Sequence, residues 1–321
     1  MANTSLFDLA VLHRADPFTG LIEDVTTLAP EFSTFGAVKR EGTWYEVASR
    51  TVLPTAQFRY VNQGVATSKS TYKKQMKEMF NMDVQLQMDE AVWKSDPASV
   101  GSLWQLEAAG AMRAAGILIG QQTWYGTSAD AKGFTGVRNQ LAYTVALQSG
   151  GNNTNTTSAY LVWMDDKEGA RFDVGEGGNF AISAPRLQQV LDGSSNPFMA
   201  FVGNLQAWLG FNIGSAYSAW SMSAIEPSTS ANWCNDSSAS QLIAKIPVAR
   251  RNNLRWFMNR TAESTLQRGR STVNIGIPSG SVLASYQAAG ADGRPAFSPL
   301  PNQMCGYPIT LTDSILDTET N

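Results

Sequence analysis

The run from Pro97 to about Thr123 most constrains the fold, because it predicts a helix of about 27 residues, roughly 40 Å long. Asp96 is a favoured N-cap residue, and proline at the first helical position loses no helical hydrogen bond. One stripe of this helix is apolar, and we expect the stripe to form the core of the folded chain. Its members are Val100, Trp104, Ala108, Ala111, Ala115 and Leu118.

Charge is sparse along this predicted helix, where only Glu107 and Arg113 are charged. We therefore expect a central and mostly covered helix. Gly101, Gly110 and Gly116 each cost roughly 1 kcal/mol relative to alanine in a helix. Close approach of another backbone is the compensation that we expect at these glycines.

Residues 37–88 predict a long β-hairpin. Side chains alternate in residues 44–51 and again in residues 58–62, with a break at Leu53-Pro54-Thr55 between the two expected strands. Neither face is consistently apolar, so the hairpin is not expected to rest on one core. We expect it to project and to find its partners elsewhere.

Positive charge is concentrated in residues 37–77, which hold eight basic and two acidic residues and so carry +6. The whole chain has a net charge of −3, so the remainder carries −9. Basic segments that meet acidic segments of neighbouring copies would explain this segregation. The candidate contact residues are Lys39, Arg40, Arg50, Arg59, Lys69, Lys73, Lys74 and Lys77.

The chain carries little charge overall, because only 16% of its 321 residues are charged, against roughly 25% in an ordinary soluble domain. Much uncharged surface must then be tolerated or covered, and copies of the chain or other partners are one explanation. The small net charge argues against a chain that binds DNA as a whole. The sequence shows neither a signal peptide nor an apolar run of membrane-spanning length, so we expect no membrane partner.

The rest of the chain divides into an N-terminal arm and a β-rich half. We expect an extended arm with short helical pieces over residues 1–36, whose isolated aromatic side chains are suited to insertion into a neighbour. They are Phe7, Phe18, Phe32 and Phe35. Together with the hairpin and the long helix, this division sets the boundaries 1–36, 37–88, 89–138, 139–228 and 229–321.

From residue 139 onward the pattern is mainly that of strands. It predicts a hairpin over residues 159–174, a long strand over 205–213 and a closing strand that contains Ile309 and Leu311. Helices are expected at residues 237–246 and at about 259–268. The basic segment 252–260 is helix-like, although residues 256–258 within it form a strand-like apolar run.

No combination of residues points to catalysis, a cofactor or a metal. His13, the lone histidine, lies in the expected arm, which is a poor holder for a general base. Cys234 and Cys305 lack the companions that a zinc site needs. We expect them to be free thiols, and a disulfide between them is the alternative that the sequence leaves open. The acidic pairs Asp165-Asp166 and Asp89-Glu90 favour solvated positions, and residues 175–178 favour a loop.

Two basic groups leave a nucleic-acid interpretation open, namely residues 69–77 and the arginines of residues 250–270. Aromatic residues lie among them, including Trp256 and Phe257. An apolar run of this kind is more often core than a platform for base stacking, and we favour pairing between subunits.

Several short motifs, taken in order, resemble the major capsid proteins of tailed double-stranded-DNA bacteriophages, and in particular the short-tailed-phage branch. The long helix closes on Trp124-Tyr125-Gly126, and the following step over residues 133–138 is similar to that branch except that Val137 stands where leucine is usual. The other matching steps are residues 157–163, 208–211, 255–260, 306–309 and 312–315. The likeness runs from about residue 36 to 321.

The resemblance implies an α+β, Hong-Kong-97-like capsid fold. Such a fold has an N-terminal arm, an extended hairpin loop, a peripheral domain with the long spine helix, and a β-rich axial domain, in a permuted segment order. The implied function is self-assembly into an icosahedral shell that encloses the double-stranded DNA genome. The implied partners are copies of the chain in hexamers and pentamers, a portal, and scaffold or decoration proteins.

In this interpretation the chain is a structural protein of the virion, assembled in the cytoplasm of the bacterial host, without enzymatic activity and without a cofactor. No cross-linking lysine–asparagine pair can be carried over, because no motif fixes those positions. Two alternatives stay open. One is the shell of an encapsulin-like bacterial nanocompartment, and the other is a β-rich carbohydrate-binding or hydrolytic protein, which the single histidine argues against.

Overall fold

The computed structural model describes residues 27–95, 97–147, 155–165, 168–175, 182–215, 217–272 and 300–319, apart from the side chains of residues 97–100, 102, 271 and 272. The helices are α2 (Glu31–Phe35), α3 (Glu90–Ser95), α4 (Pro97–Tyr125), α5 (Asp236–Ala244) and α6 (Arg260–Thr272). The strands are β1 (Ala37–Arg40), β2 (Trp44–Val52), β3 (Thr71–Glu78), β4 (Phe80–Asp89), β5 (Tyr143–Ala146), β6 (Thr157–Trp163), β7 (Ala170–Gly175), β8 (Arg186–Leu191), β9 (Pro197–Ile213), β10 (Ala219–Ile225), β11 (Leu254–Met258), β12 (Gln303–Met304) and β13 (Tyr307–Leu311).

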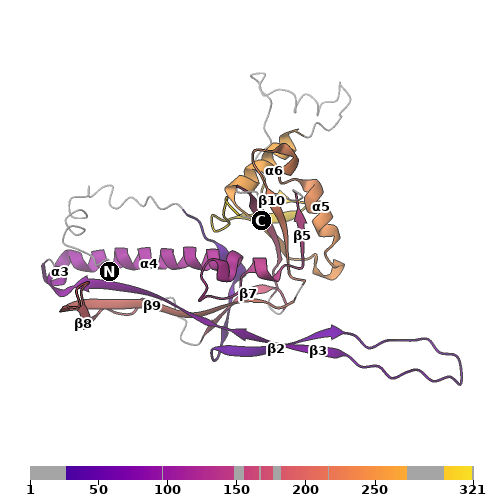
Figure 1. Cartoon of the computed structure of the whole chain (residues 1–321), viewed down its shortest axis with the longest axis horizontal. Helices are drawn as coiled ribbons and strands as arrows, with labels where there is room; N and C mark the ends of the chain where they lie inside the picture. Colours follow the sequence, from indigo (N-terminus) through magenta and orange to yellow (C-terminus); the bar gives the residue numbers. More distant parts are fainter. Residues whose placement is uncertain are drawn as a thin grey trace, which may run out of the picture.

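The first sheet is long and narrow, and α4 lies along it (Figure 1). Its strands follow the order β1-β7-β9-β4, with β8 also paired to β9. The predicted strand 205–213 is present and is extended to Pro197–Ile213, so that β4 pairs with it over its whole length from Phe80 to Asp89. α3 and β8 lie at the end of this sheet that is farthest from α5 and α6 (Figure 1).

The second sheet forms a separate lobe at the other end of α4 (Figure 1). Its order is β12-β13-β11-β6-β10-β5, and α5 and α6 pack against it. The helices predicted at residues 237–246 and 259–268 are present as α5 and α6. Asn235 caps α5, because its side chain accepts a hydrogen bond from the Ser238 N–H at 2.8 Å. Asn259 caps α6 in the same way through the Ala262 N–H at 2.9 Å. The closing strand is β13, which lies parallel to β11.

Two predictions for the β-rich half are wrong. Residues 159–174 form no hairpin, because β6 pairs with β10 and β11 while β7 pairs with β1 and β9. The chain does turn between them, and the Gly169 N–H donates to the Asp165 carbonyl at 3.2 Å, but this turn joins two sheets. The segment 252–260 is mainly strand β11, as the run of residues 256–258 indicates, because its apolar side chains are buried beneath α5 and α6.

An aromatic core joins the two sheets, the end of α4 and α2. Trp124 of α4 stacks on Tyr160 of β6 with ring centroids 4.9 Å apart. Phe35 stacks on Phe257 at 4.8 Å and also meets Phe211 edge-on at 5.3 Å. The second sheet therefore shares one core with the first sheet, although no strand is common to both.

This core corrects the expectation that Phe32 and Phe35 insert into a neighbour. Phe35 is buried within its own chain, and Phe32 packs against the same cluster, 5.1 Å from the ring of Phe172. Both belong to α2, which follows Pro30 and lies against α4. Residues 1–26, with Phe7, Phe18 and His13, lie outside the described residues.

The long helix runs from Pro97 to Tyr125, two residues beyond the predicted end, and Asp96, its expected cap, lies outside the described residues. Gly126 follows it with a φ of +57°, a left-handed conformation that favours glycine at a helix end. A Cβ on Gly126 would lie 2.2 Å from the Gly136 nitrogen. The Trp-Tyr-Gly step is thus a helix stop against which the 133–138 segment is packed.

The buried face of α4 differs from the predicted stripe. Trp104 and Ala111 are buried, as are Ala115 and Ile119, but Leu118 is 38% exposed and does not belong to the core. Leu118 precedes Ile119, which takes the inward position on the helix. The side chain of Val100 lies outside the described residues.

The helix is also less covered than predicted, since Leu106, Met112 and Leu118 are all exposed in the isolated chain. A Cβ placed on Gly101, Gly110 or Gly116 would meet no atom within 4 Å, so the expected close approach is absent from these glycines. At Gly120, side chains and not a second backbone approach the helix closely. A Cβ there would lie 2.8 Å from Oε2 of Glu31 and 2.2 Å from Oγ of Ser314.

Candidate inter-subunit surface

Strands β2 and β3 form a two-stranded ladder that projects from the body of the molecule (Figure 1). The ladder runs from the Trp44–Glu78 pair to the Val52–Thr71 pair, and no residue of either strand is buried. The predicted second strand, residues 58–62, is wrong, because this segment lies in the loop that joins β2 and β3. The predicted hairpin segment, residues 37–88, also includes nearly all of β4, but β4 pairs with β9 in the first sheet.

The loop beyond the ladder remains narrow. Its two arms are joined where the Thr55 N–H donates to the Ser68 hydroxyl at 3.0 Å and that hydroxyl donates back to the Thr55 carbonyl at 3.1 Å. A turn closes the tip, where the Gln63 N–H donates to the Tyr60 carbonyl at 3.2 Å. The alternating residues 58–62 thus lie outside the ladder, and Val61 and Asn62 belong to the tip turn, where Asn62 has a φ of +68°.

The eight basic candidates lie along β1 and the hairpin, and two of them have carboxylate partners in the chain. Arg40 lies 3.3 Å from Asp173, and Lys74 lies 2.9 Å from Glu46 across the ladder. Within the described part of the chain, the other six form no ion pair. They are Lys39, Arg50, Arg59, Lys69, Lys73 and Lys77.

Two of these six cations have weaker partners near the outer end of the hairpin. The guanidinium of Arg50 lies over the Tyr72 ring, 5.5 Å from its centroid, and Arg59 donates to the Gln63 carbonyl at 2.9 Å. Both contacts are exposed to solvent. Both guanidinium groups therefore remain able to meet a carboxylate on another surface.

The base of the hairpin is anchored to its own chain through Asp173 of β7, whose side chain is 2% exposed. The Tyr45 hydroxyl donates to this carboxylate, and Arg40 and Arg171 lie 3.3 and 3.5 Å from it. Burial, and then the Asp173 charge, raise the pKa of the Tyr45 hydroxyl, while burial lowers the pKa of Lys77. The hairpin is thus held at one end and open at the other.

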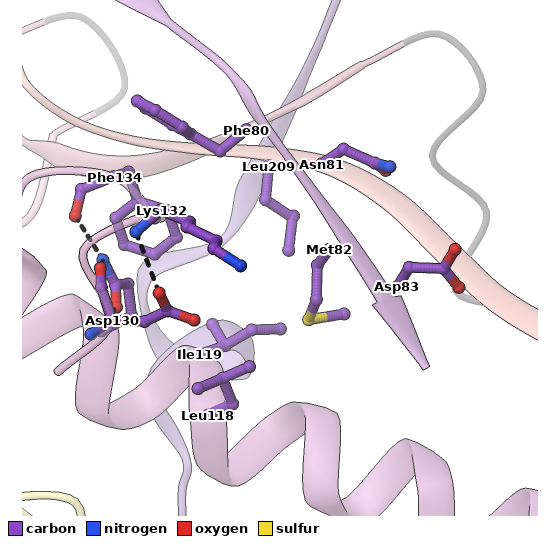
Figure 2. Close-up of a pocket in the computed structure, with 12 residues that line it drawn as sticks. Phe80, Asn81, Met82, Asp83, Leu118, Ile119, Asp130, Lys132, Phe134 and Leu209 are labelled. Carbon is purple, nitrogen blue, oxygen red and sulfur yellow. Dashed lines mark hydrogen bonds between the residues drawn. The ribbon is translucent and has the colours of Figure 1, made fainter. Parts of the chain in front are cut away.

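A groove lies beside this base, between β4 and the last turns of α4 (Figure 2). Its volume is about 360 Å³. Asn81, Asp83, Gln122, Asp130, Lys132 and Gly133 contribute its polar edge. The apolar side chains that line it are Phe80, Met82, Leu118, Ile119, Phe134 and Leu209.

The second basic group, the arginines of residues 250–270, is largely engaged within the chain. Arg250 pairs with Glu168 at 2.9 Å, Arg260 with Asp313 at 2.8 Å, and Arg270 with Asp236 at 2.7 Å. Trp256 and Phe257 are fully buried, as expected for core residues. These contacts favour a structural role for the group over phosphate binding.

Sequence reasoning missed three buried carboxylates, Asp173, Glu31 and Glu319. Oε1 of Glu31 accepts hydrogen bonds from Trp124 at 2.8 Å and from the hydroxyl of Thr312, and burial raises the pKa of Glu31 above its ordinary value. Glu319 accepts from the Tyr125 hydroxyl at 2.5 Å. In residues 172–174 an acidic residue stands between two apolar residues, and this pattern could have indicated that Asp173 is buried.

Of the remaining chemical candidates, Asp166 and residues 176–178 lie outside the described residues, while Asp165 accepts a hydrogen bond from the Glu168 N–H at 2.9 Å. Asp89 accepts a hydrogen bond from the Ala91 N–H at 2.7 Å, and Glu90 pairs with Lys94 at 2.6 Å, so this acidic pair serves α3. Cys234 and Cys305 are free thiols, and burial raises the pKa of both. Across the described ranges, no group of three or more His, Cys, Asp or Glu residues is arranged to hold a metal ion.

No helix among the described residues is long and apolar enough to cross a membrane.

Comparison with known proteins identifies a sequence family and a fold. The family model described as major capsid protein GP7 matches residues 40–321. No curated protein matches the sequence. The structure is similar to a chain of the bacteriophage Epsilon15 structure, with a TM-score of 0.67 and 17% identity over 100% of this chain and 97% of that one.

Weaker likenesses also exist. A chain from Mycobacterium phage Adephagia gives a TM-score of 0.45 at 13% identity, over 66% of this chain and 92% of that one. A chain from the capsid of an empty GTA particle gives 0.42 at 10% identity, over 69% and 99% respectively.

Proposed function

This chain belongs to the family of the major capsid protein GP7, which makes it a shell-forming protein of a phage capsid, and from that premise we propose how each subunit joins its neighbours. The chain self-associates through its projecting hairpin, which lies over a neighbouring subunit. Repetition of this contact builds the hexamers and pentamers of an icosahedral shell. The family favours this assignment over the nanocompartment shell.

The observation that carries the proposal is the exposure of the hairpin. Its ladder buries no residue, and its loop exposes Phe58, Tyr60 and Val61 at 108%, 80% and 88%. Large apolar side chains gathered in this way usually mark an interaction site. The exposed hairpin cations that form no ion pair within the described residues suit a neighbour whose surface is acidic, and the chain outside residues 37–77 carries −9.

The shell encloses double-stranded DNA with little tight phosphate binding. Each phosphate contact adds to the affinity and to its salt dependence, so many copies with several contacts each would hinder release of the genome. The arginines of residues 250–270 support this view, because Arg250, Arg260 and Arg270 already have carboxylate partners. We expect unassembled subunits to bind duplex DNA at micromolar affinity or weaker at physiological salt. Sub-micromolar binding with a steep salt dependence would contradict enclosure.

Other features of the proposal follow from the family. The subunit has a structural role without catalysis, and its further partners are a portal and scaffold or decoration proteins. Assembly takes place in the cytoplasm of the bacterial host. Residues 89–138 correspond to the peripheral domain, residues 139–228 to long strands of both domains, and residues 229–321 to the axial domain.

Shortening the hairpin tests the central proposal. Residues 56–67 are replaced by a two-residue Asn-Gly turn, which leaves the β2–β3 ladder in place. We expect the unfolding free energy of the unassembled subunit to stay within about 0.5 kcal/mol of wild type, since surface changes have small effects. Electron microscopy should then show no shells. Val248→Ala, at an apolar residue that is 78% exposed outside the hairpin, is the control and should assemble. Normal shells from the shortened protein would refute the proposal.

A further inference from the structure

The groove beside the hairpin base has the properties of a receiving site. Its apolar side comes from four parts of the chain: Phe80 and Met82 of β4, Leu118 of α4, Leu209 of β9, and the segment that contains Phe134 (Figure 2). Its volume of about 360 Å³ lies in the range of pockets that hold small molecules or anchoring side chains. Leu118 is 38% exposed here, which the core of a single chain does not explain.

The edge of the groove is acidic. Asp83 and Asp130 are exposed at it, and within the described residues neither carboxylate forms an ion pair. One oxygen of Asp130 accepts from the Lys132 N–H at 2.9 Å, which leaves the other open to solvent. Lys132 contributes one positive charge, so the edge carries two negative charges and one positive charge.

The hairpin tip has the complementary properties. Phe58 is fully exposed, and the next residue is Arg59. Phe58 and Arg59 are adjacent on this exposed loop, so an inserted Phe58 brings Arg59 to the edge of the groove. The Arg59 guanidinium donates to the Gln63 carbonyl at 2.9 Å, and this contact is exposed to solvent. Aromatic and arginine side chains are the residues that most often dominate the energy of protein interfaces.

The tip cannot reach the groove of its own chain, because the hairpin projects away from β4 and α4 (Figure 1). The occupant must then belong to another molecule, and the chain is a self-associating shell protein. We propose that the groove receives the hairpin tip of a second copy, with Phe58 against its apolar side and Arg59 between Asp83 and Asp130. This inference rests on the proposed overlap of subunits and adds the receiving surface.

Cross-linking tests the contact directly. Gln57→Cys and Asn81→Cys place thiols at the exposed tip and at the exposed edge of the groove, in a Cys305→Ser background that leaves the buried Cys234 as the remaining thiol. A short bismaleimide should join neighbouring subunits in assembled shells into covalent multimers. Gln57→Cys with Val248→Cys is the matched control and should stay largely monomeric. Cross-linking of the control pair alone would overturn the inference.

Charge exchange provides a second, independent test. Arg59→Glu alone, and Asp83→Lys with Asp130→Lys, should each abolish shell formation while the circular dichroism spectrum stays that of the folded subunit. The three substitutions combined should restore shells, because the charges are complementary again. Absence of any restoration would contradict the pairing. This test decides the matter if the cysteine variants fail to assemble.

The two proposals fail in distinguishable ways. If the subunit with the shortened hairpin still forms shells, the overlap itself is refuted. If that subunit forms no shells but residues 57 and 81 do not cross-link in shells of the cysteine variant, the overlap stands and the receiving groove is wrong. Rapid maleimide labelling of Asn81→Cys in intact shells would also refute the groove, because an occupied groove should shield that thiol.

Discussion

Two antiparallel ladders of this chain, β2–β3 and β6–β11, have similar hydrogen bonding and opposite environments. All seven residues of β6 are buried, whereas none of the nine residues of β2 is, and its last three are all exposed. The β6–β11 ladder gains its stability from side chains of its own chain, among them Trp124 and Phe257. The β2–β3 ladder has no such cover in the isolated subunit.

This difference separates two kinds of contribution. Residues of the aromatic core stabilise the subunit, and their loss should reduce its unfolding free energy. Residues of the hairpin contribute little to that quantity, so their effect should appear when subunits associate. The substitutions below test this division at residues of the core and of the hairpin, in order of decreasing effect on the unassembled subunit.

The largest effect is expected for Trp104→Ala. Trp104 is 8% exposed and packs edge-on against Trp93 at 6.0 Å, and a Cβ on Gly203 would lie 2.6 Å from its ring. Its truncation should lower the unfolding free energy by about 3–5 kcal/mol in urea titrations. Trp44→Ala, at a tryptophan that is 55% exposed on the hairpin, should change it by about 0.5 kcal/mol or less. Equal losses for both tryptophans would break the comparison.

The base of the hairpin lies at the boundary between the two regions. Tyr45→Phe removes a hydrogen bond to the buried carboxylate of Asp173 and should cost roughly 1.5–3 kcal/mol, the range for bonds to charged groups. Tyr72→Phe is the control, because the Tyr72 hydroxyl receives only an exposed contact of 3.4 Å from Arg50. Thermal unfolding of both variants measures the difference. If Tyr45→Phe leaves the stability of the subunit unchanged, the hydrogen bond between Tyr45 and Asp173 is not needed for folding.

A smaller, pH-dependent effect is expected for Glu31 in the core. Its folded-state pKa is raised by burial above the ordinary 4.5, so the unfolded chain loses the proton at lower pH than the folded chain does. Subunit stability should therefore fall as pH rises from the unfolded-state pKa to the raised folded-state pKa. Glu31→Gln retains the oxygen that accepts from Trp124 and removes this pH dependence.

The comparison of the two proteins is made by urea unfolding between pH 4 and pH 7. The stability of Glu31→Gln relative to wild type should increase with pH over this interval. A difference that stays constant with pH would show that the carboxyl titrates alike in the folded and unfolded states.

The smallest effect on the subunit is expected for Arg50→Glu, at an exposed hairpin side chain. Its unfolding free energy should change by about 0.5 kcal/mol or less. Shell yield, measured by sedimentation of the assembly mixture, should nevertheless fall strongly, because the reversed charge opposes the acidic surface of a neighbour. Arg186→Glu, at an exposed arginine of β8 that lies outside both the hairpin and the groove, tests whether any charge reversal has the same result. An unfolded Arg50→Glu subunit, or one that assembles normally, would contradict the proposed role of the hairpin.

Much of the architecture could be predicted from the sequence. The helix over residues 97–125, the long strand β9 and the helices α5 and α6 have strong local patterns, and local patterns are what periodicity detects. The partners of strands could not be predicted in the same way. The strands of residues 159–174 follow one another closely with a turn between them, which also suits a hairpin, yet β6 and β7 join different sheets.

The candidate site could be predicted only in part, because the sequence does not show which strands pair. The basic hairpin could be located from its charge and its mixed faces, whereas its true second strand, residues 71–78, required knowledge of the pairing. Leu118 fits the apolar stripe equally well, but Ile119 takes the inward position on the helix. The groove joins residues of β4, α4 and the 130–134 segment, and no local pattern reports such a combination.

Hydrogen exchange of the same protein before and after assembly tests the central claim most directly. We expect backbone amides of residues 53–70 to exchange rapidly in the unassembled subunit and to become protected in the shell, while amides of β6 and β11 are protected in both. Hairpin-tip amides that exchange at the same rate in the shell as in the free subunit would contradict it.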